Sequence, residues 1–302
     1  MAEEKEITGN DAECSRLEQK LGFDRIREII AARCATEYAA GRVADEKFSA
    51  SPSEITKRLR LADEMRLIMM FEESFPTNGY IDSIGFLRPL EKSSISIDLL
   101  SLRKLRTTLE TLRKLTAFFE DVKDGVYPNL KRMASGIMNF AEVQRRMDGI
   151  LDKYSEVKDT ASDELYAIRR TLRDKEGSIS KRINLILRRA KEEGLVDGDA
   201  TVTMRDGKML IPVQSANKKK FSGFVYDESA SGKTTYIEPA EVVELDNEIR
   251  ELKFAEQREI VRILYEFTEF LRPYIPELID ASIFIGEIDF LMAKAQVALD
   301  FV

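Results

Sequence analysis

The segment from residue 201 to residue 239 constrains the fold most, because it is the one part of the chain with strand-like composition. Asp206-Gly207 predicts a two-residue hairpin turn, since Gly tolerates the positive φ that a type I′ turn requires. Residues 229–232 predict a second turn. We therefore expect a small antiparallel β module of about four strands. The apolar residues expected on its half-buried surface are Val202, Met204, Leu210, Ile211, Val213, Phe221, Phe224, Val225, Tyr236 and Ile237.

Two long helical segments of similar length flank this module. Ser162 is a helix cap with acidic residues after it, and the second segment begins after Pro239. Each holds about 32 residues, roughly 48 Å at the rise of an α-helix. The apolar spacing near 3.5 is typical of a coiled-coil seam. We expect an antiparallel pair with the β module at its far tip. The seam residues are Leu165, Ile168, Leu172, Ile179, Ile183, Ile186 and Ala190, then Leu245, Ile249, Leu252, Ile260, Ile263, Phe267 and Phe270.

The remaining sequence predicts a helical bundle. Ser51-Pro52-Ser53-Glu54 has the pattern of a helix start with a reciprocal capping box. A leucine-rich helix is expected from about Asp98 to Val122, and a last amphipathic helix from about Glu277 to Leu299. The fold class is therefore mainly α with a small antiparallel β module.

Composition excludes several kinds of site. The chain has no histidine, which rules out Ser-His-Asp and Cys-His nucleophilic sites and His-ligated metals. We predict no catalytic, cofactor-binding or metal-binding residue in this chain. Two cysteines suit a reducing compartment, and the longest apolar run, residues 67–71, is too short to span a bilayer. These features predict a cytoplasmic protein.

Charge is unevenly distributed, although the net charge is only −7. The first long segment and the β module are rich in Lys and Arg, and the second long segment is rich in Glu. Three consecutive lysines, residues 218–220, are expected in a loop between strands, where they suit phosphate contacts. We predict eight nucleic-acid-binding residues: Lys218, Lys219, Lys220, Lys208, Arg205, Arg188, Arg189 and Lys233. The alternatives are pairing with the glutamates of the second segment, or solvated turn residues.

A nucleotide-binding loop is not expected. Ser231-Gly-Lys-Thr234 contains the end of a P-loop pattern, but the position that must be Gly is Asp227. The segment also leads into a predicted strand, whereas a P-loop leads into a helix.

Short motifs are spread over nearly the whole chain. They are Leu21-Gly-Phe-Asp-Arg-Ile26, Val157-Lys-Asp-Thr-Ala-Ser-Asp-Glu-Leu165, Arg205-Asp-Gly-Lys208, Ile211-Pro-Val213, Gly223, Tyr226-Asp227, Ser229-Ala-Ser-Gly232, Tyr236-Ile-Glu-Pro239, Val243-Glu-Leu-Asp-Asn-Glu248 and Asp289-Phe-Leu-Met-Ala-Lys-Ala295. Together these motifs resemble the second branch of the MutS family, which lacks the mismatch-reading domain. Two departures are Lys233, where the family usually carries Ala, and the absence of a common His near Tyr226.

The resemblance implies a domain plan. It has a disordered tail (1–14), a helical core and lever (15–161), an outgoing lever helix (162–200), a β clamp (201–239), and a returning lever helix with a final core helix (240–302). An ATPase domain using ATP and Mg²⁺, and often a nuclease domain, would follow. No Gly-x4-Gly-Lys-Ser/Thr pattern occurs, so the chain resembles an N-terminal fragment that is not itself an enzyme. The resemblance implies a homodimer for the full-length protein and a monomer or weak dimer for the fragment.

Three functions are open, the first two of them implied by the resemblance. The first is a clamp that grips branched or recombining duplex DNA in DNA repair and recombination control. The second is a ribosome-rescue factor that grips rRNA phosphates. The third is a coiled-coil arm that binds a partner other than a nucleic acid. No membrane partner is expected.

Overall fold

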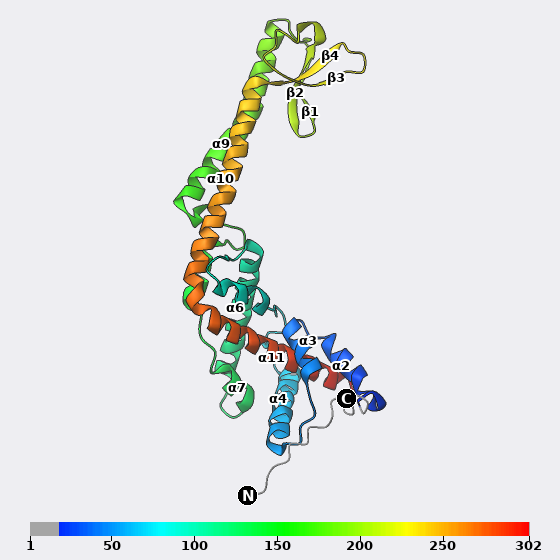
Figure 1. Ribbon diagram of the computed structural model, residues 1–302, viewed down its shortest axis with the longest axis vertical. Coiled ribbons are helices and arrows are strands. Elements are labelled where there is room, and N and C mark those ends of the chain that lie inside the picture. The colour runs from blue at the N-terminus through cyan, green and yellow to red at the C-terminus, as the bar shows by residue number, and fades with distance from the viewer. Residues whose placement is uncertain (1–17, 302) are drawn as a thin grey trace. The chain divides into compact units, whose positions relative to one another are not determined.

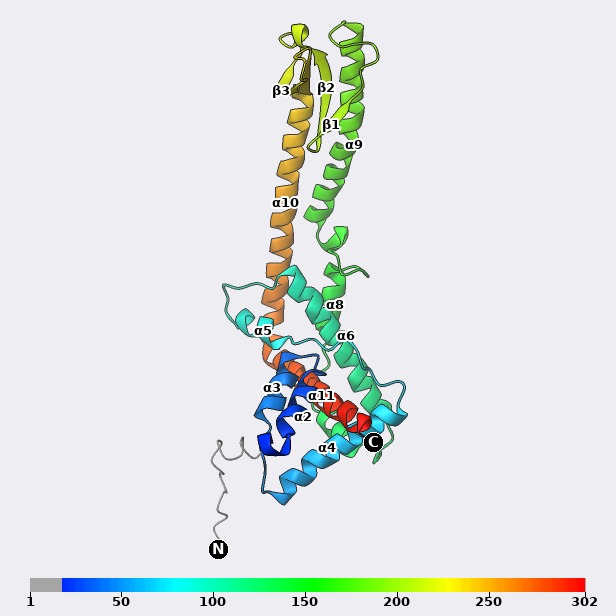
Figure 2. The same cartoon turned by 90° about the vertical axis from the view of Figure 1, so that its right-hand side faces the viewer.

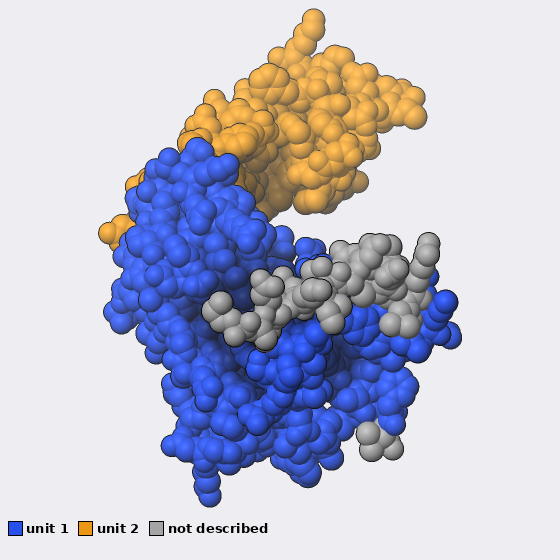
Figure 3. Space-filling view, turned by 60° about the horizontal axis from the view of Figure 1, so that its bottom comes forward, with its two compact units in different colours: residues 1–148, 264–302 blue, residues 149–263 orange. Residues whose placement is uncertain are grey.

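The computed structural model describes residues 18–301, so the tail predicted for residues 1–14 lies outside the described residues. The chain is mainly helical, with one four-stranded antiparallel sheet (Figure 1). Two compact units are formed, one by residues 1–148 and 264–302 and the other by residues 149–263 (Figure 3). Among the described residues, no helix combines the length and apolarity needed to cross a membrane.

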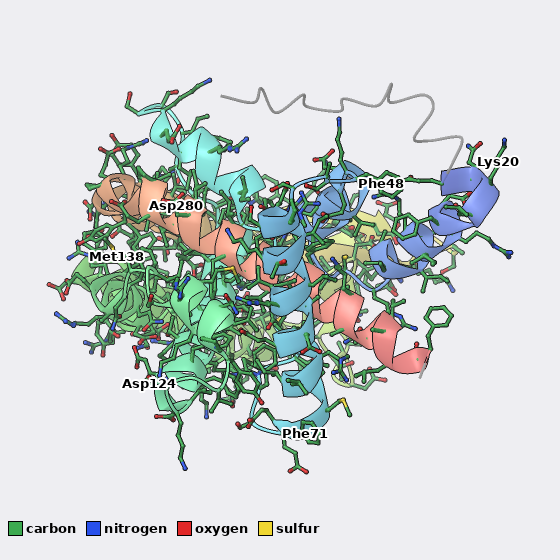
Figure 4. The ribbon with its side chains drawn as sticks, turned by 90° about the horizontal axis from the view of Figure 1, so that it is seen from below. Lys20, Phe48, Phe71, Asp124, Met138 and Asp280 are labelled. Atoms are coloured by element: carbon green, nitrogen blue, oxygen red, sulfur yellow. The ribbon has the colours of Figure 1, made fainter. Side chains whose placement is uncertain are left out.

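Unit 1 is built around α11 (Ile275–Asp300). This helix is apolar around most of its circumference, which is the pattern of a helix that is buried on all sides. It contacts α2, α3, α4, α5 and α6, and Figure 4 shows α4 crossing it. The other helices of unit 1 are α2 (Phe23–Ala31), α3 (Glu37–Asp45), α4 (Pro52–Phe71), α5 (Ile84–Leu87), α6 (Leu99–Asp121), α7 (Pro128–Ala134) and α8 (Ala141–Ile150), with 3-10 turns η1 (Arg88–Glu91) and η4 (Arg272–Tyr274).

The start of α4 differs from the predicted capping box. Pro52 occupies the first turn as expected, but Ser51 makes no capping hydrogen bond. The Ser51 hydroxyl instead lies 3.0 Å from that of Ser53, and Glu54 accepts a hydrogen bond from Ser49 at 2.5 Å. In a capping box the Glu54 carboxylate would accept a hydrogen bond from the Ser51 backbone N–H, and here Ser49 binds that carboxylate instead.

Unit 2 contains the first long helix, the sheet and the second long helix as far as Ile263 (Figure 2). Helix α9 (Asp163–Glu192) begins after Ser162, whose hydroxyl accepts a hydrogen bond from Leu165 N at 3.0 Å. This confirms the predicted cap. Helix α10 (Ala240–Leu271) begins directly after Pro239, as predicted. The 3-10 turn η2 (Asp159–Ala161) precedes α9.

Ion pairs connect α9 with α10. Arg169 pairs with Glu256 at 2.7 Å, Lys175 with Glu248 at 2.5 Å, and Arg182 with Glu241 at 3.2 Å. The residue number on α10 falls as that on α9 rises, which is the order expected of helices running in opposite directions. These contacts agree with the alternative that part of the basic charge on the first segment pairs with the glutamates of the second.

The predicted seam is only partly buried. Leu165, Ile168, Ile183 and Ala190 are buried in α9, whereas Leu172 and Ile179 are half-buried. The middle of α9 also carries no fully buried residue between positions 168 and 183. Ion pairs and half-buried side chains therefore replace a continuous apolar seam there.

The sheet has the strand order β1-β2-β4-β3. Its strands are β1 (Thr203–Arg205), β2 (Lys208–Gln214), β3 (Gly223–Glu228) and β4 (Thr234–Pro239), with the 3-10 turn η3 (Ser215–Asn217) after β2. Asp206 and Gly207 have φ angles of 47° and 78°, which confirms the predicted turn. All three strand pairs are antiparallel, and β3 carries a bulge between Val225 and Asp227.

One face of the sheet packs on the C-terminal half of α9. The central strands β2 and β4 supply Ile211, Val213 and Ile237 to this small core, and α9 supplies Ile183 and Leu187. The two edge strands contribute little to it. Three residues predicted on the half-buried surface are therefore exposed, Met204 by 66%, Phe224 by 62% and Val225 by 55%. The sequence does not distinguish edge strands from central ones, and this is why the prediction was wrong for them.

Candidate nucleic-acid interface

The lysine run is held against the end of helix α9. Strand β2 ends at Gln214, whose backbone N–H donates to Leu195 O at 3.4 Å. Three residues later the side-chain amide of Asn217 donates to Gly194 O at 3.3 Å. Gly194 has a φ of 65°, a conformation typical of the residue that ends a helix. Lys218 therefore directly follows Asn217, the residue that contacts the end of α9.

The turn between β3 and β4 reaches the same end of unit 2. Ser215 N donates to Lys233 O at 2.9 Å, and Lys218 Nζ lies 3.1 Å from a carboxylate oxygen of Glu228. The predicted residues Lys218, Lys219, Lys220 and Lys233 are thus brought near the C-terminal turns of α9. Arg188 and Arg189 lie in those turns.

Five of these cations have no ionic partner. Arg188, Arg189, Lys219, Lys220 and Lys233 are exposed, and none pairs with a carboxylate anywhere in residues 18–301. Lys218 differs because it is paired with Glu228. We call the five the free cations. Exposed, unpaired Lys and Arg side chains can meet phosphates without first breaking an ion pair.

Arg205 and Lys208 flank the β1–β2 turn. The Arg205 guanidinium is 3.8 Å from the centroid of the Tyr236 ring and pairs with Asp227 on β3. Lys208 Nζ is 2.5 Å from a carboxylate oxygen of Glu238. Both side chains are therefore engaged in ion pairs across the sheet, which distinguishes them from the free cations.

Tyr226 adds a further link between the edge strands. Its hydroxyl donates to Asp206 at 2.6 Å, which ties β3 to the β1–β2 turn. This hydrogen bond to a carboxylate raises the pKa of Tyr226. The side chains of Tyr226, Asp206, Arg205 and Asp227 thus join two strands that do not pair with each other in the ladder.

A pair of carboxyl groups lies at the junction between β4 and α10. The Glu238 side chain is 5% exposed, and its Oε1 atom is buried without a donor among the described residues. Burial raises the pKa of Asp246, and the charge and hydrogen bonding of Glu238 raise it further. Asp246 therefore keeps its proton to a higher pH in the folded chain than in the unfolded one.

Sequence reasoning missed two features of this site. It grouped Arg205 and Lys208 with the lysine run, because ion pairs across a sheet depend on strand order. It also predicted that Phe224 and Val225 of β3 lie on the half-buried surface of the sheet, whereas both are exposed. The acidic residues of the module, among them Asp227, Glu228 and Glu238, indicate that some of its cations are paired, but they do not show which ones.

Comparison with known proteins gives a consistent result, although no family model matches the chain. The chain is 30% identical over 292 residues to Endonuclease MutS2 of Alkaliphilus metalliredigens, covering 96% of this chain and 36% of that protein. It is 32% identical over 291 residues to Endonuclease MutS2 of Thermomicrobium roseum, covering 95% and 36%. These matches support a MutS2-like family. The chain spans 36% of the length of both MutS2 relatives.

Proposed function

We propose that the β module and the end of α9 bind the phosphate backbone of DNA. The observation that carries this proposal is the cluster of five free cations at one end of unit 2. They carry positive charge in an otherwise acidic protein, and charge of this kind gives sequence-independent backbone binding. The similarity to proteins named Endonuclease MutS2 favours DNA as the polyanion.

We further propose a mechanical role for the rest of unit 2. Residues 162–200 and 240–272 would act as levers, and residues 201–239 as a clamp. The ion pairs between α9 and α10 support this, because they fix two long helices along their lengths. In the full-length protein, ATP binding elsewhere would move the levers, and the clamp would close on branched or recombining duplex DNA.

The salt dependence of DNA binding tests the proposal. Each phosphate neutralised on duplex DNA contributes about 0.9 to the slope of log affinity against log salt concentration. Replacing Lys219 and Lys220 by Ala should therefore reduce the slope by about 1.8. The affinity for a fluorescently labelled duplex, measured by anisotropy over a series of salt concentrations, gives this slope.

The matched control is Lys114→Ala with Lys123→Ala. Both lysines are exposed residues of unit 1, and the double variant loses the same charge. An equal effect of the two double variants would show that net charge, and not this site, governs binding. Ribosomes that displace the duplex at far lower phosphate concentration would instead favour the rRNA alternative.

A further inference from the structure

Strand β3 carries two exposed aromatic residues, Phe224 and Tyr226, and no other part of the described chain buries them. All six residues of β3 are exposed, and β3 is an edge strand. The bulge at Tyr226 interrupts the ladder there. Phe224 and Tyr226 line an open hollow of about 270 Å³ together with Lys208, Val225, Glu238 and Val243.

The charges around this hollow are balanced within the protein. Lys208 is paired with Glu238, Asp227 with Arg205, and the Tyr226 hydroxyl with Asp206. A phosphate group would therefore gain little binding free energy there. A neutral, flat group would gain more, because the Phe224 ring offers it an apolar face that is otherwise exposed to water.

Three of the five free cations flank this strand in sequence. Lys219 and Lys220 precede it, and Lys233 follows it in the turn to β4. Lys220 is four residues from Phe224, about 13 Å in an extended chain. Proteins bind single-stranded nucleic acid by combining aromatic rings, on which bases stack, with cations that contact the backbone.

We infer that Phe224, with Tyr226 beside it, is a stacking site for an unpaired nucleobase. This inference rests on the proposed function and specifies its substrate. The free cations hold the backbone, and Phe224 receives a base that is not in a duplex. The module would then favour DNA with a single-stranded arm over a continuous duplex, because stacked and paired bases cannot reach the ring.

A forked duplex with 2-aminopurine in its unpaired arm tests this, because stacking quenches the fluorescence of that base. We expect the protein to quench the fluorescence, and Phe224→Ala to lose most of the quenching. The affinity of that variant for the fork should fall about tenfold, the usual effect of removing one base-stacking ring. Its affinity for the continuous duplex should stay within twofold.

Two further variants serve as controls. Met204→Ala removes an equally exposed apolar side chain from the other edge strand and should leave quenching unchanged. Tyr226→Phe keeps the ring and loses only the hydrogen bond to Asp206, and it should also retain quenching. Circular dichroism melts check that Phe224→Ala is folded.

The possible results separate this inference from the proposed function. Equal quenching by the protein and by Phe224→Ala would overturn the stacking site. The stacking site would also be overturned if the protein is a dimer that Phe224→Ala converts to a monomer without any effect on quenching. Strand β3 would then be an edge through which two copies of the protein associate. Lysine-dependent duplex binding without quenching would overturn the inference alone. Failure to bind either DNA at low salt would overturn both.

Discussion

At the scale of single residues, two buried carboxylates each hold the start of another helix. Asp289 of α11 accepts hydrogen bonds from Ala35 N, Thr36 N and the Thr36 hydroxyl, at 2.8 to 3.2 Å. Glu64 of α4 accepts from Asn129 N and Leu130 N at the start of α7. The first N–H groups of a helix have no partner within it, and a carboxylate also suits the helix dipole.

Asp289→Asn should destabilise unit 1 by about 1–3 kcal/mol, because hydrogen bonds to a charged acceptor are lost inside the protein. Urea denaturation followed by circular dichroism measures this. Asp280→Asn is the matched control, since Asp280 lies on the same helix and is exposed (Figure 4). Similar changes in the two variants would contradict the role given to Asp289.

Asp246 predicts a pH dependence of unit 2. Its pKa is raised above 3.8 by burial and by Glu238, while Lys208 and Arg250 oppose the shift. Above pH 3.8 the folded chain therefore holds a proton that the unfolded chain has lost, and stability falls as pH rises until the folded pKa is passed. Asp246→Asn should flatten the decline in melting temperature from pH 4 to pH 7 and raise its value at pH 7. A decline as steep as in the unsubstituted protein would contradict this.

At the scale of elements, the long helices were predictable and the sheet surface was not. The seams, the Ser162 cap and Pro239 mark α9 and α10 within a few residues, because these signals are local. The Asp206-Gly207 turn is equally local. Strand order is set by tertiary packing, so the sequence could not show that β3 is exposed or that Arg205 and Lys208 are paired. The positions of the free cations were predicted, but their lack of partners was not.

Two glycines in helices should respond oppositely to alanine. A Cβ at Gly177 of α9 would meet no atom within 4 Å, so Gly177→Ala should stabilise the helix by about 1 kcal/mol. A Cβ at Gly286 of α11 would lie 2.3 Å from Cδ1 of Tyr38, so Gly286→Ala should destabilise by about 1–3 kcal/mol. Thermal melts of both variants test this. A stabilised Gly286→Ala would contradict the close contact between α11 and α3.

The ion pairs of α9 should contribute different amounts to the free energy of unfolding. Arg169 is 20% exposed and contacts Asp159, Glu256 and Val157 O. Arg169→Ala should cost about 1–3 kcal/mol, because it leaves partly buried acceptors without a donor. Lys175→Ala should cost less than about 1 kcal/mol, since its pair with Glu248 is largely exposed. Equal losses in chemical denaturation would contradict this ranking.

At the scale of the whole molecule, the basic residues of unit 2 fall into two groups with separate tasks. Arg205, Lys208 and Lys218 are paired with carboxylates of the sheet. Lys219, Lys220 and Lys233 are free, as are Arg188 and Arg189 of α9. We propose that the first group maintains the sheet and that the free cations bind DNA. Composition alone gives every Lys and Arg the same weight.

The most direct test compares two triple alanine variants with the same loss of charge. The first replaces Lys219, Lys220 and Lys233, and the second replaces Arg205, Lys208 and Lys218. We measure the melting temperature and the salt dependence of duplex binding for both. The first variant should keep its melting temperature and lose about 2.7 from the salt slope. The second should melt at lower temperature and lose less of the slope. Equal losses of slope in the two variants would contradict the account.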